Sequence, residues 1–147
     1  MNTKYIVPPD LAPPPEPYAH GVEWQGLVFV SGQVAFDEEN RIVGVGDAEA
    51  QARQVWRNIA SVVEAADGVV TDVVKITVFL SDIRHAQAEI AVRQSIFPTG
   101  KFPICTLVQV ANLGLPDLLM EIDAIAVVGR SAGIGSTGET TDQPVDD

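Results

Sequence analysis

The chain has 147 residues, about the size of one domain, and 46% of them are hydrophobic, which is enough for a folded core. A formal net charge of −11 argues against a general nucleic-acid binder, because phosphate contacts require Lys and Arg. Cys105 is the single cysteine, which excludes an internal disulfide and a thiol-rich metal site. No apolar run approaches the roughly 20 residues of a membrane helix, and no signal-peptide pattern opens the chain. We therefore expect a cytoplasmic protein.

A proline-rich segment opens the chain, and a strand follows it. Proline disfavours helix, so we expect residues 1–17 to form an extended arm. Residues 26–32 (GLVFVSG) are a short apolar run between glycines, which is typical of a buried strand. Residues 37–40 predict a turn, and residues 41–44 are a candidate for the returning arm of a hairpin.

Helical periodicity begins at Asp47. From there to Ala66, small and apolar residues recur every three or four positions, with Asp47 as the N-cap and Asp67-Gly68 as the stop. Residues 73–80 are rich in β-branched side chains and predict a strand. Residues 82–97 predict a second helix, which Pro98 closes.

Two more strands, residues 104–110 and 118–128, complete the order β–β–α–β–α–β–β. This order predicts an α+β fold with one β-sheet and two helices on one face. In the last strand, alternate residues form an apolar row suited to lie under the helices: Leu118, Met120, Ile122, Ala124, Ala126 and Val128. The opposite row sets Glu121 and Asp123 among apolar residues, too apolar for water and too polar for a monomer core. We therefore expect a subunit interface that gathers polar groups.

The last segment, residues 131–147, is acidic and contains neither a base nor a hydrophobic period. We expect it to be a disordered tail, with a docking peptide as the alternative. The sequence thus divides into an arm (1–17), one domain (18–130) and this tail (131–147).

Several segments, in this order and spacing, resemble the reactive intermediate deaminase family (RidA, formerly YjgF). They are Tyr18 in PEPYAHG, Ser31-Gly32-Gln33, Gln51-Ala52-Arg53-Gln54, residues 75–80 (KITVFL), Phe102-Pro103, and Glu121 in MEIDAIAV. The resemblance covers nearly the whole chain except the tail. It implies a chorismate-mutase-like fold and a homotrimer whose sheets form a central barrel. It also implies small-molecule clefts between subunits, and no cofactor.

The resemblance implies hydrolysis of an enamine or imine to a carbonyl compound and ammonia. It assigns to Glu121 the orientation and deprotonation of the attacking water. An interface carboxylate paired with Lys75 is the alternative for Glu121. Tyr18, Ser31 and Gly32 match family positions that contact the ligand. For Tyr18 the alternative is packing of the arm, and for the other two it is a plain strand-ending turn.

One position departs from the family pattern. The family motif is similar to Phe-Pro-x-Arg-x-x-Val, and its arginine, which binds the substrate carboxylate, corresponds here to Cys105. A thiol cannot form a bidentate charged pair, so we expect a substrate other than the archetypal amino-acid-derived imines. We assign Cys105, Thr106, Leu107 and Phe97 to the substrate-binding set. Cys105 either shapes the pocket or acts as a nucleophile.

Other chemistries lack a recognisable pattern. The sequence shows no metal-ligand spacing and no phosphate-binding loop, so we expect no metal and no cofactor. Three alternatives to a deaminase stay open. They are a metabolite-sensing trimer without catalysis, a tautomerase or water-addition enzyme of a catabolic or natural-product pathway, and a ribonuclease, which the acidic composition disfavours.

Overall fold

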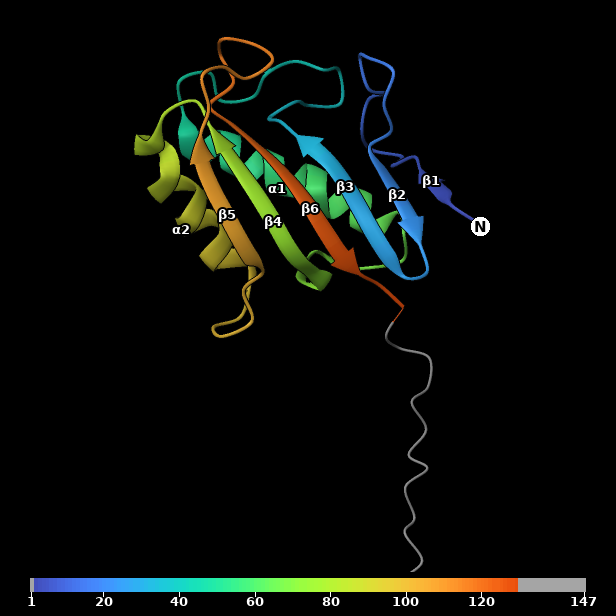
Figure 1. The fold of residues 1–147 in the computed structure, drawn as a ribbon. Helices are drawn as coiled ribbons and strands as arrows, with labels where there is room; N and C mark the ends of the chain where they lie inside the picture. Colours follow the sequence, from blue (N-terminus) through green and yellow to red (C-terminus); the bar gives the residue numbers. More distant parts are fainter. Residues whose placement is uncertain (1, 130–147) are drawn as a thin grey trace, which may run out of the picture.

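The computed structural model describes residues 2–129, and the tail prediction for residues 131–147 lies outside them. Six strands form one sheet in the order β1-β2-β3-β6-β4-β5 (Figure 1). The strands are β1 (Lys4–Ile6), β2 (Gly21–Trp24), β3 (Leu27–Gln33), β4 (Val73–Leu80), β5 (Ile104–Gln109) and β6 (Met120–Val127). The helices are α1 (Ala48–Glu64) and α2 (Ala86–Ile96), with short 3₁₀ turns η1 (Val70–Asp72) and η2 (Ile83–His85).

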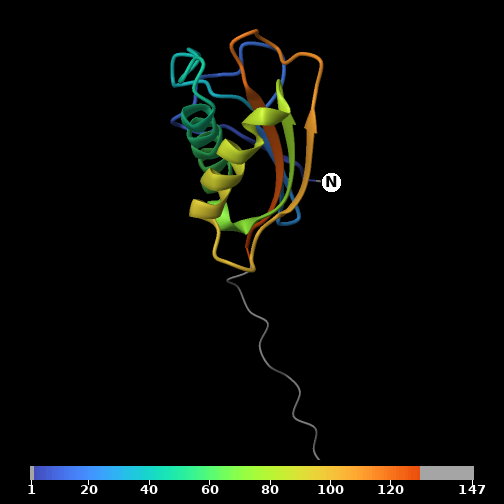
Figure 2. The same cartoon turned by 90° about the vertical axis from the view of Figure 1, so that its left-hand side faces the viewer.

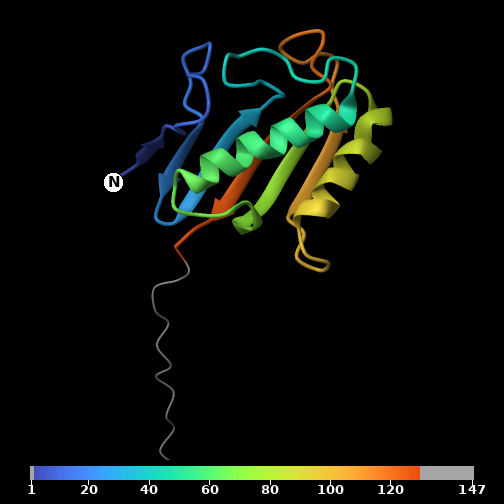
Figure 3. The same cartoon turned by 180° about the vertical axis from the view of Figure 1, so that it is seen from behind.

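Both helices cover the same face of the sheet, as the sequence predicts (Figures 2 and 3). All strand pairs are antiparallel except β4 and β5, which are parallel because η2 and α2 carry the chain back between them. Strand β5 is one edge of the sheet and β1 is the other. The second face of the sheet is free of helices, and it is the face turned to the viewer in Figure 1. No helix in the described part is long and apolar enough to cross a membrane.

Helix α1 begins and ends where the sequence indicates. The side chain of Asp47 accepts a hydrogen bond from the Ala50 amide at 3.0 Å and caps the first turn. After the last turn, Asp67 adopts φ +61°, and the Gly68 amide bonds back to Val63. Between these ends, the apolar stripe of the helix is fully buried against the sheet.

The first hairpin differs from the prediction. Residues 41–44 form no strand, and only an isolated bridge joins Phe36 and Ile42. The true partner of β3 is β2, across a two-residue turn in which Gln25 has φ +51° and Gly26 has φ +79°. Two positive φ values define a type I′ turn, whose twist matches that of the strands. Glutamine is an uncommon residue at the first position of such a turn, so the sequence signal is weak.

The second helix starts later than predicted, at Ala86 rather than at residue 82. The Asp82 side chain accepts from the Arg84 amide and starts the 3₁₀ turn η2 instead. Ile83, which the helical pattern places on the apolar stripe, is consequently exposed. The helix ends before Phe97 and Pro98, as the proline requires.

The alternation in β6 is confirmed. Met120, Ile122, Ala124 and Ala126 are buried under the helices, and the residues between them are partly exposed on the open face. Large apolar side chains remain exposed on neighbouring strands of this open face: Phe29, Ile104 and Val108. An apolar sheet face of this kind is unusual on a protein that acts as a monomer.

Candidate functional site

A β-bulge interrupts the pairing of β3 and β6. Val30 pairs with Ala124, but the next paired residue on β3 is Gln33, opposite Ile122. Ser31 and Gly32 thus occupy a stretch that holds one residue too many for a regular ladder. The extra residue turns Gln33 to the helix side, where it is buried opposite Ile122, and Gly32 lies next to Glu121, the residue that precedes Ile122 in β6.

The carboxyl group of Glu121 lies directly against the backbone of Gly32. A Cβ atom at residue 32 would lie 2.8 Å from the Glu121 Cδ and closer still to Oε1, a separation that real side chains do not adopt. Only glycine can therefore occupy position 32 while Glu121 keeps this position. The bulge and the absent side chain together make room for one carboxyl group on the open face.

A hollow of about 570 Å³ opens beside this carboxyl, a size typical of small-molecule sites. It is lined by the arm, by the bulge, by the loop after β3 and by the loop before β6. The lining residues are Pro15, Glu16, Tyr18, Ser31, Gly32, Val34, Phe36, Asn40, Gly114, Leu115, Leu118 and Glu121. Most of the wall is apolar, with carboxyl, hydroxyl and amide groups placed within it.

The arm is attached to the bulge by hydrogen bonds. Both the amide and the hydroxyl of Ser31 donate to the carbonyl oxygen of His20, at 3.0 Å. The His20 ring bonds through Nε2 to the Ala12 carbonyl at 2.8 Å and lies edge-on to the Tyr18 ring. Gln33 Nε2 donates to the Ser31 carbonyl at 3.3 Å. These bonds hold Tyr18 at the rim of the hollow, where its ring is about half exposed.

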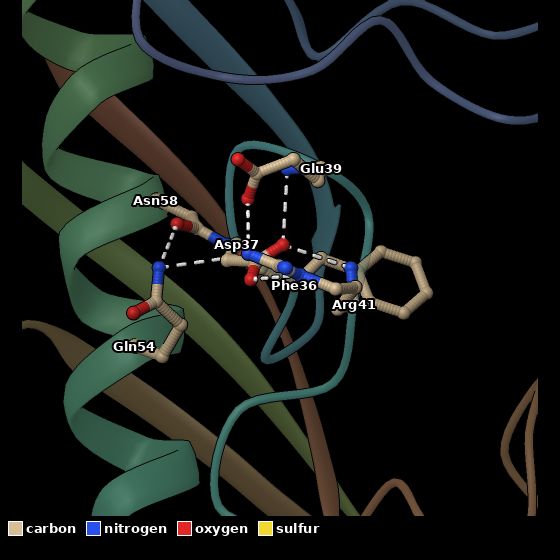
Figure 4. Close-up of polar contacts among 6 residues, drawn as sticks. All are labelled: Phe36, Asp37, Glu39, Arg41, Gln54 and Asn58. Carbon is tan, nitrogen blue, oxygen red and sulfur yellow. Dashed lines mark hydrogen bonds and ion pairs between the residues drawn. The ribbon is translucent and has the colours of Figure 1, made fainter.

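Helix α1 holds two loops of the hollow with three amide side chains. Asn58 Nδ2 donates to the carbonyls of Val34 and Phe36, both at 3.0 Å, and Gln54 Nε2 donates to Phe36 at 3.1 Å (Figure 4). Gln51, which is fully buried, donates to the Asp117 carbonyl and accepts from the Leu119 amide, each at 2.8 Å. The loop after β3 and the loop before β6 therefore rest on one helix.

The loop after β3 is also braced from within. Asp37 Oδ1 accepts from the amides of Glu39 and Arg41, and its Oδ2 pairs with the Arg41 side chain at 2.9 Å (Figure 4). These bonds and the Arg41 pairing lower the pKa of Asp37, so the loop stays closed on itself at neutral pH. Asn40 at its tip donates to the Pro13 carbonyl at 3.2 Å and joins the loop to the arm.

Two of the titratable groups that line the hollow, Glu121 and Tyr18, have raised pKa values. Burial, followed by the negative charge of Asp123, raises the pKa of Glu121 above its usual 4.5. Burial, then the carboxylates of Glu121 and Glu16, raise the pKa of Tyr18 above 10.0. At neutral pH the phenol is therefore a hydrogen-bond donor, and the carboxyl is a stronger base than an exposed glutamate.

The sequence-predicted site residues fall into two groups. Tyr18, Ser31, Gly32 and Glu121 come together around the hollow. In contrast, Cys105, Thr106 and Leu107 lie on the edge strand β5, outside the hollow of their own chain.

Within β5, neighbouring residues point to opposite faces. Cys105 pairs with the core-facing Ile76, so it lies on the helix side of the sheet, and it is exposed. Thr106 pairs with Thr77 on the open face. A cysteine on this edge is accessible to a second subunit but not to the hollow of its own chain.

Phe97 corrects the predicted substrate-binding set. It is only 4% exposed, and its ring packs edge-on against Trp56 with 5.4 Å between ring centroids. We assign Phe97 to the core between the two helices.

Sequence reasoning missed several lining residues. Glu16, Phe36, Asn40 and Leu115 lie in the arm or in loops, where no periodicity marks the direction of a side chain. Leu118, which the sequence places at the start of the apolar row of the last strand, is buried just before β6 and also lines the hollow. The proline-rich arm and the Gly-Leu-Pro loop at residues 114–116 were the available signals. Within the described residues, no group of three His, Cys, Asp or Glu side chains could hold a metal ion.

The sheet and the hollow define an α+β protein with a small-molecule site built around one half-buried carboxyl. Comparisons agree with this class. A family model described as endoribonuclease L-PSP matches residues 10–128. The chain belongs to this family, the Rid/YjgF/L-PSP family, whose members include enamine and imine deaminases.

Solved structures show the same fold. The YjgF gene product from E. coli is 32% identical, with 84% of this chain and 98% of that chain covered and a TM-score of 0.76. RidA from the Antarctic bacterium Psychrobacter is 30% identical, with 85% and 99% covered and a TM-score of 0.78. E. coli TdcF with bound serine is 30% identical, with 86% and 99% covered and a TM-score of 0.74. The predicted chorismate-mutase-like α+β fold is confirmed.

Proposed function

We propose that this protein hydrolyses an enamine or imine to a carbonyl compound and ammonia, with Glu121 as the group that activates water. The observation that carries this proposal is the position of the Glu121 carboxyl against the Gly32 backbone, at the wall of a largely apolar hollow. A base with a raised pKa in such a place suits the removal of a proton from water. A family that includes enamine and imine deaminases supports the same reaction class.

The reaction needs only water and the side chains of the hollow. Glu121 accepts one proton from water as the water oxygen bonds to the carbon of a protonated C=N group, and the C=N electron pair moves to nitrogen. Glu121 then returns this proton to nitrogen. The C–N bond breaks with its electrons on ammonia, the hydroxyl proton passes to Glu121, and then to ammonia. One iminium ion and one water give one carbonyl and one ammonium ion, and an enamine enters after tautomerisation to the imine.

The other polar groups hold the reacting atoms. The Ser31 hydroxyl donates its hydrogen bond to the His20 carbonyl, so its oxygen can only accept a hydrogen bond from a substrate N–H. The Tyr18 hydroxyl is a donor suited to the oxygen of the carbinolamine and the carbonyl product. Both groups lie in the wall that contains Glu121.

A second subunit completes the site in this proposal. The open face exposes Phe29, Ile104 and Val108, and closed cyclic symmetry is the ordinary way to bury identical surfaces. A homotrimer would place the β5 residues Cys105, Thr106 and Leu107 of one subunit at the hollow of its neighbour. Light scattering should give three times the chain mass. A stable monomer would contradict this part of the proposal.

Position 105 carries a cysteine where the family pattern has an arginine that binds the substrate carboxylate. We therefore propose that the protein belongs to a divergent subgroup with an unusual substrate. A guanidinium introduced by Cys105→Arg should then raise the affinity for small 2-oxo acids, because an arginine can bind a carboxylate with two parallel bonds. Cys105→Ser separates the two roles of the thiol. Normal turnover indicates a pocket-shaping residue, and near-complete loss indicates a nucleophile.

Glu121→Gln tests the reaction itself. Glutamine keeps the size of the side chain but cannot take a proton from water, so ammonia release from a panel of enamines and imines should fall by about 10²–10⁴-fold. Glu38→Gln is the matched control, because it makes the same change of side chain at an exposed position outside the hollow. If Glu121→Gln keeps near wild-type turnover, Glu121 is structural and the mechanism is wrong.

Ligand binding without turnover would instead favour the sensing alternative. TdcF with bound serine shows that a relative holds a small molecule without any implied chemistry. For the ribonuclease alternative, incubation of RNA with the trimer should leave it intact, because the acidic chain offers little to hold phosphate.

A further inference from the structure

All the charged side chains that line the hollow, within the described residues, are acidic. Two carboxyl side chains, Glu16 and Glu121, line it, and none of its other lining residues in the described part is Lys, Arg or His. It has polar groups of only two further kinds, the hydroxyls of Tyr18 and Ser31 and the amide of Asn40. An anionic ligand would therefore enter a negative, partly desolvated site without a countercharge.

The basic residues are engaged or distant. In the described part of the chain, five of them form ion pairs with acids outside the hollow: Arg41 with Asp37 and Glu39, Arg53 with Glu49, Lys75 with Asp123, Arg84 with Asp82, and Arg93 with Glu89. Lys4, Arg57 and Lys101 do not line the hollow. The strand that a neighbour would add in the proposed trimer, Ile104–Gln109, carries no charge. The second subunit would thus close the hollow without changing the sign of its charge.

The wall also offers aromatic surface. Tyr18 at the rim and Phe36 in the loop after β3 both line the hollow. The faces of aromatic rings attract cations, and they do so most where water is excluded. After burial, the negative charges of Glu121 and Glu16 both raise the pKa of the Tyr18 phenol. The two carboxylates therefore act on the same group at the rim of the hollow.

We infer that the hollow selects a positively charged small molecule without a carboxylate, an iminium ion or an amine-bearing imine. This inference rests on the proposed function, of which it names the substrate class. The charge of the site also serves the reaction, because two carboxylates favour the protonated C=N group, and that form is the one that water attacks.

Three probes of similar size separate the charges. N,N-dimethylpyrrolidinium is a permanent cation without a C=N bond, cyclopentanone is neutral, and 1-pyrroline-2-carboxylate carries the carboxylate. Calorimetric titration of the full chain at neutral pH should rank their affinities in that order, with at least about tenfold between cation and carboxylate. The preference should shrink at high salt, because the carboxylates are partly exposed. Equal or tighter binding of the carboxylate would overturn the inference.

A charge-neutralising pair of variants locates the effect. Glu16→Gln removes a carboxylate that lines the hollow without a part in the reaction, and it should reduce the preference for the cation several-fold. Glu38→Gln removes the same charge from an exposed loop position outside the hollow, and it should leave the preference unchanged. If both variants reduced the preference equally, the net charge of the whole protein would explain it, and the inference would be overturned.

The binding measurement is independent of catalysis. Selective binding of the cation with no ammonia release from any imine would contradict the proposed function and leave the charge selectivity standing. Ammonia release from carboxylate-bearing imines, together with binding of 1-pyrroline-2-carboxylate, would keep the function and overturn the substrate class.

Discussion

Two glutamates on opposite sides of the sheet, Glu121 on β6 and Glu89 on α2, both have raised pKa values but lie in different surroundings. Burial raises the pKa of Glu121 in the hollow and also that of Glu89 between the helices. Glu89 is fully buried, lies 3.2 Å from the guanidinium of Arg93 and accepts from the Trp56 indole at 3.3 Å. Glu121 has no such partner in the described chain, and it lies against a glycine backbone beside open volume.

The difference shows that a raised carboxyl pKa does not by itself mark a reactive site. Around Glu89, the Trp56 indole N–H donates to Oε1, and Oε2 lies in an ion pair with Arg93 and is buried without a hydrogen-bond donor. Around Glu121 the geometry leaves the oxygens available to a ligand or a water. The first arrangement predicts a role in stability and the second a role in chemistry, and each prediction below tests that division.

The largest expected effect is on the helix side. Glu89→Ala leaves the Arg93 charge and the Trp56 N–H without a partner between the helices, which should lower the free energy of unfolding by about 3–5 kcal/mol. Urea denaturation measures the change. Turnover per folded molecule should stay unchanged, and a selective loss of turnover would show that Glu89 acts on the site.

On the open face, Gly32→Ala should reduce the rate of the reaction and leave the stability of the fold nearly unchanged. The added methyl collides with the carboxyl of Glu121 and displaces it, and a displacement of about 1 Å can cost about 10²-fold in rate. Steady-state kinetics measures the loss, and the denaturation midpoint should change far less than in Glu89→Ala. Gly114 lines the hollow and Gly100 has φ +82°, so neither glycine is a control, and Glu38→Ala, at an exposed position outside the hollow, serves instead. Full activity in Gly32→Ala would mean that Glu121 moves freely and is not held by the bulge.

Asn58 lies between the two regions, because it is on the helix and holds a loop of the hollow. Asn58→Ala leaves the carbonyl of Val34 without its side-chain donor and removes one of the two donors to the carbonyl of Phe36, which should cost about 1–3 kcal/mol of stability. The loop also carries Phe36 of the wall, so KM should rise more than kcat falls. Glu64→Ala, at an exposed position of the same helix, should change neither quantity. A fall in kcat alone would place Asn58 in the chemistry rather than in positioning.

The pH dependence of stability gives the smallest expected effect, and together with the pH dependence of the kinetics it distinguishes the two carboxyls most finely. A carboxyl whose pKa is higher in the folded than in the unfolded protein binds its proton more tightly when folded. As the pH rises from about 4.5 through the raised values, the free energy of unfolding should therefore fall. Glu89→Gln and Glu121→Gln should each flatten this slope.

Only one of these two variants should alter the kinetics. The acid limb of kcat/KM should lie above pH 4.5 and belong to Glu121, since the base must lose its proton to act. Glu89→Gln should leave that limb in place. A limb that moves with Glu89 would remove the division between the two carboxyls.

The sequence by itself determined the two helices, the strands β3 to β6 and their layers, but it did not predict β1, β2 or the hairpin that joins β2 to β3. The period of apolar residues in α1, the cap at Asp47 and the alternation in β6 are local properties, and each is confirmed in the structure. Glu121 stood out for the same reason, because a carboxyl in the middle of an apolar strand interrupts a regular pattern.

Only the tertiary structure decided how the site is assembled. The bulge that places Gly32 under Glu121 is a mismatch between two strands far apart in the chain, and no residue signals it alone. The same holds for the hydrogen bonds by which Gln51 and Asn58 support the loops of the hollow. Phe97 and Cys105 carry the same lesson, since the direction of a side chain near a helix end or on an edge strand depends on what packs there. Contacts between distant segments are set by packing, and packing is a property of the whole chain.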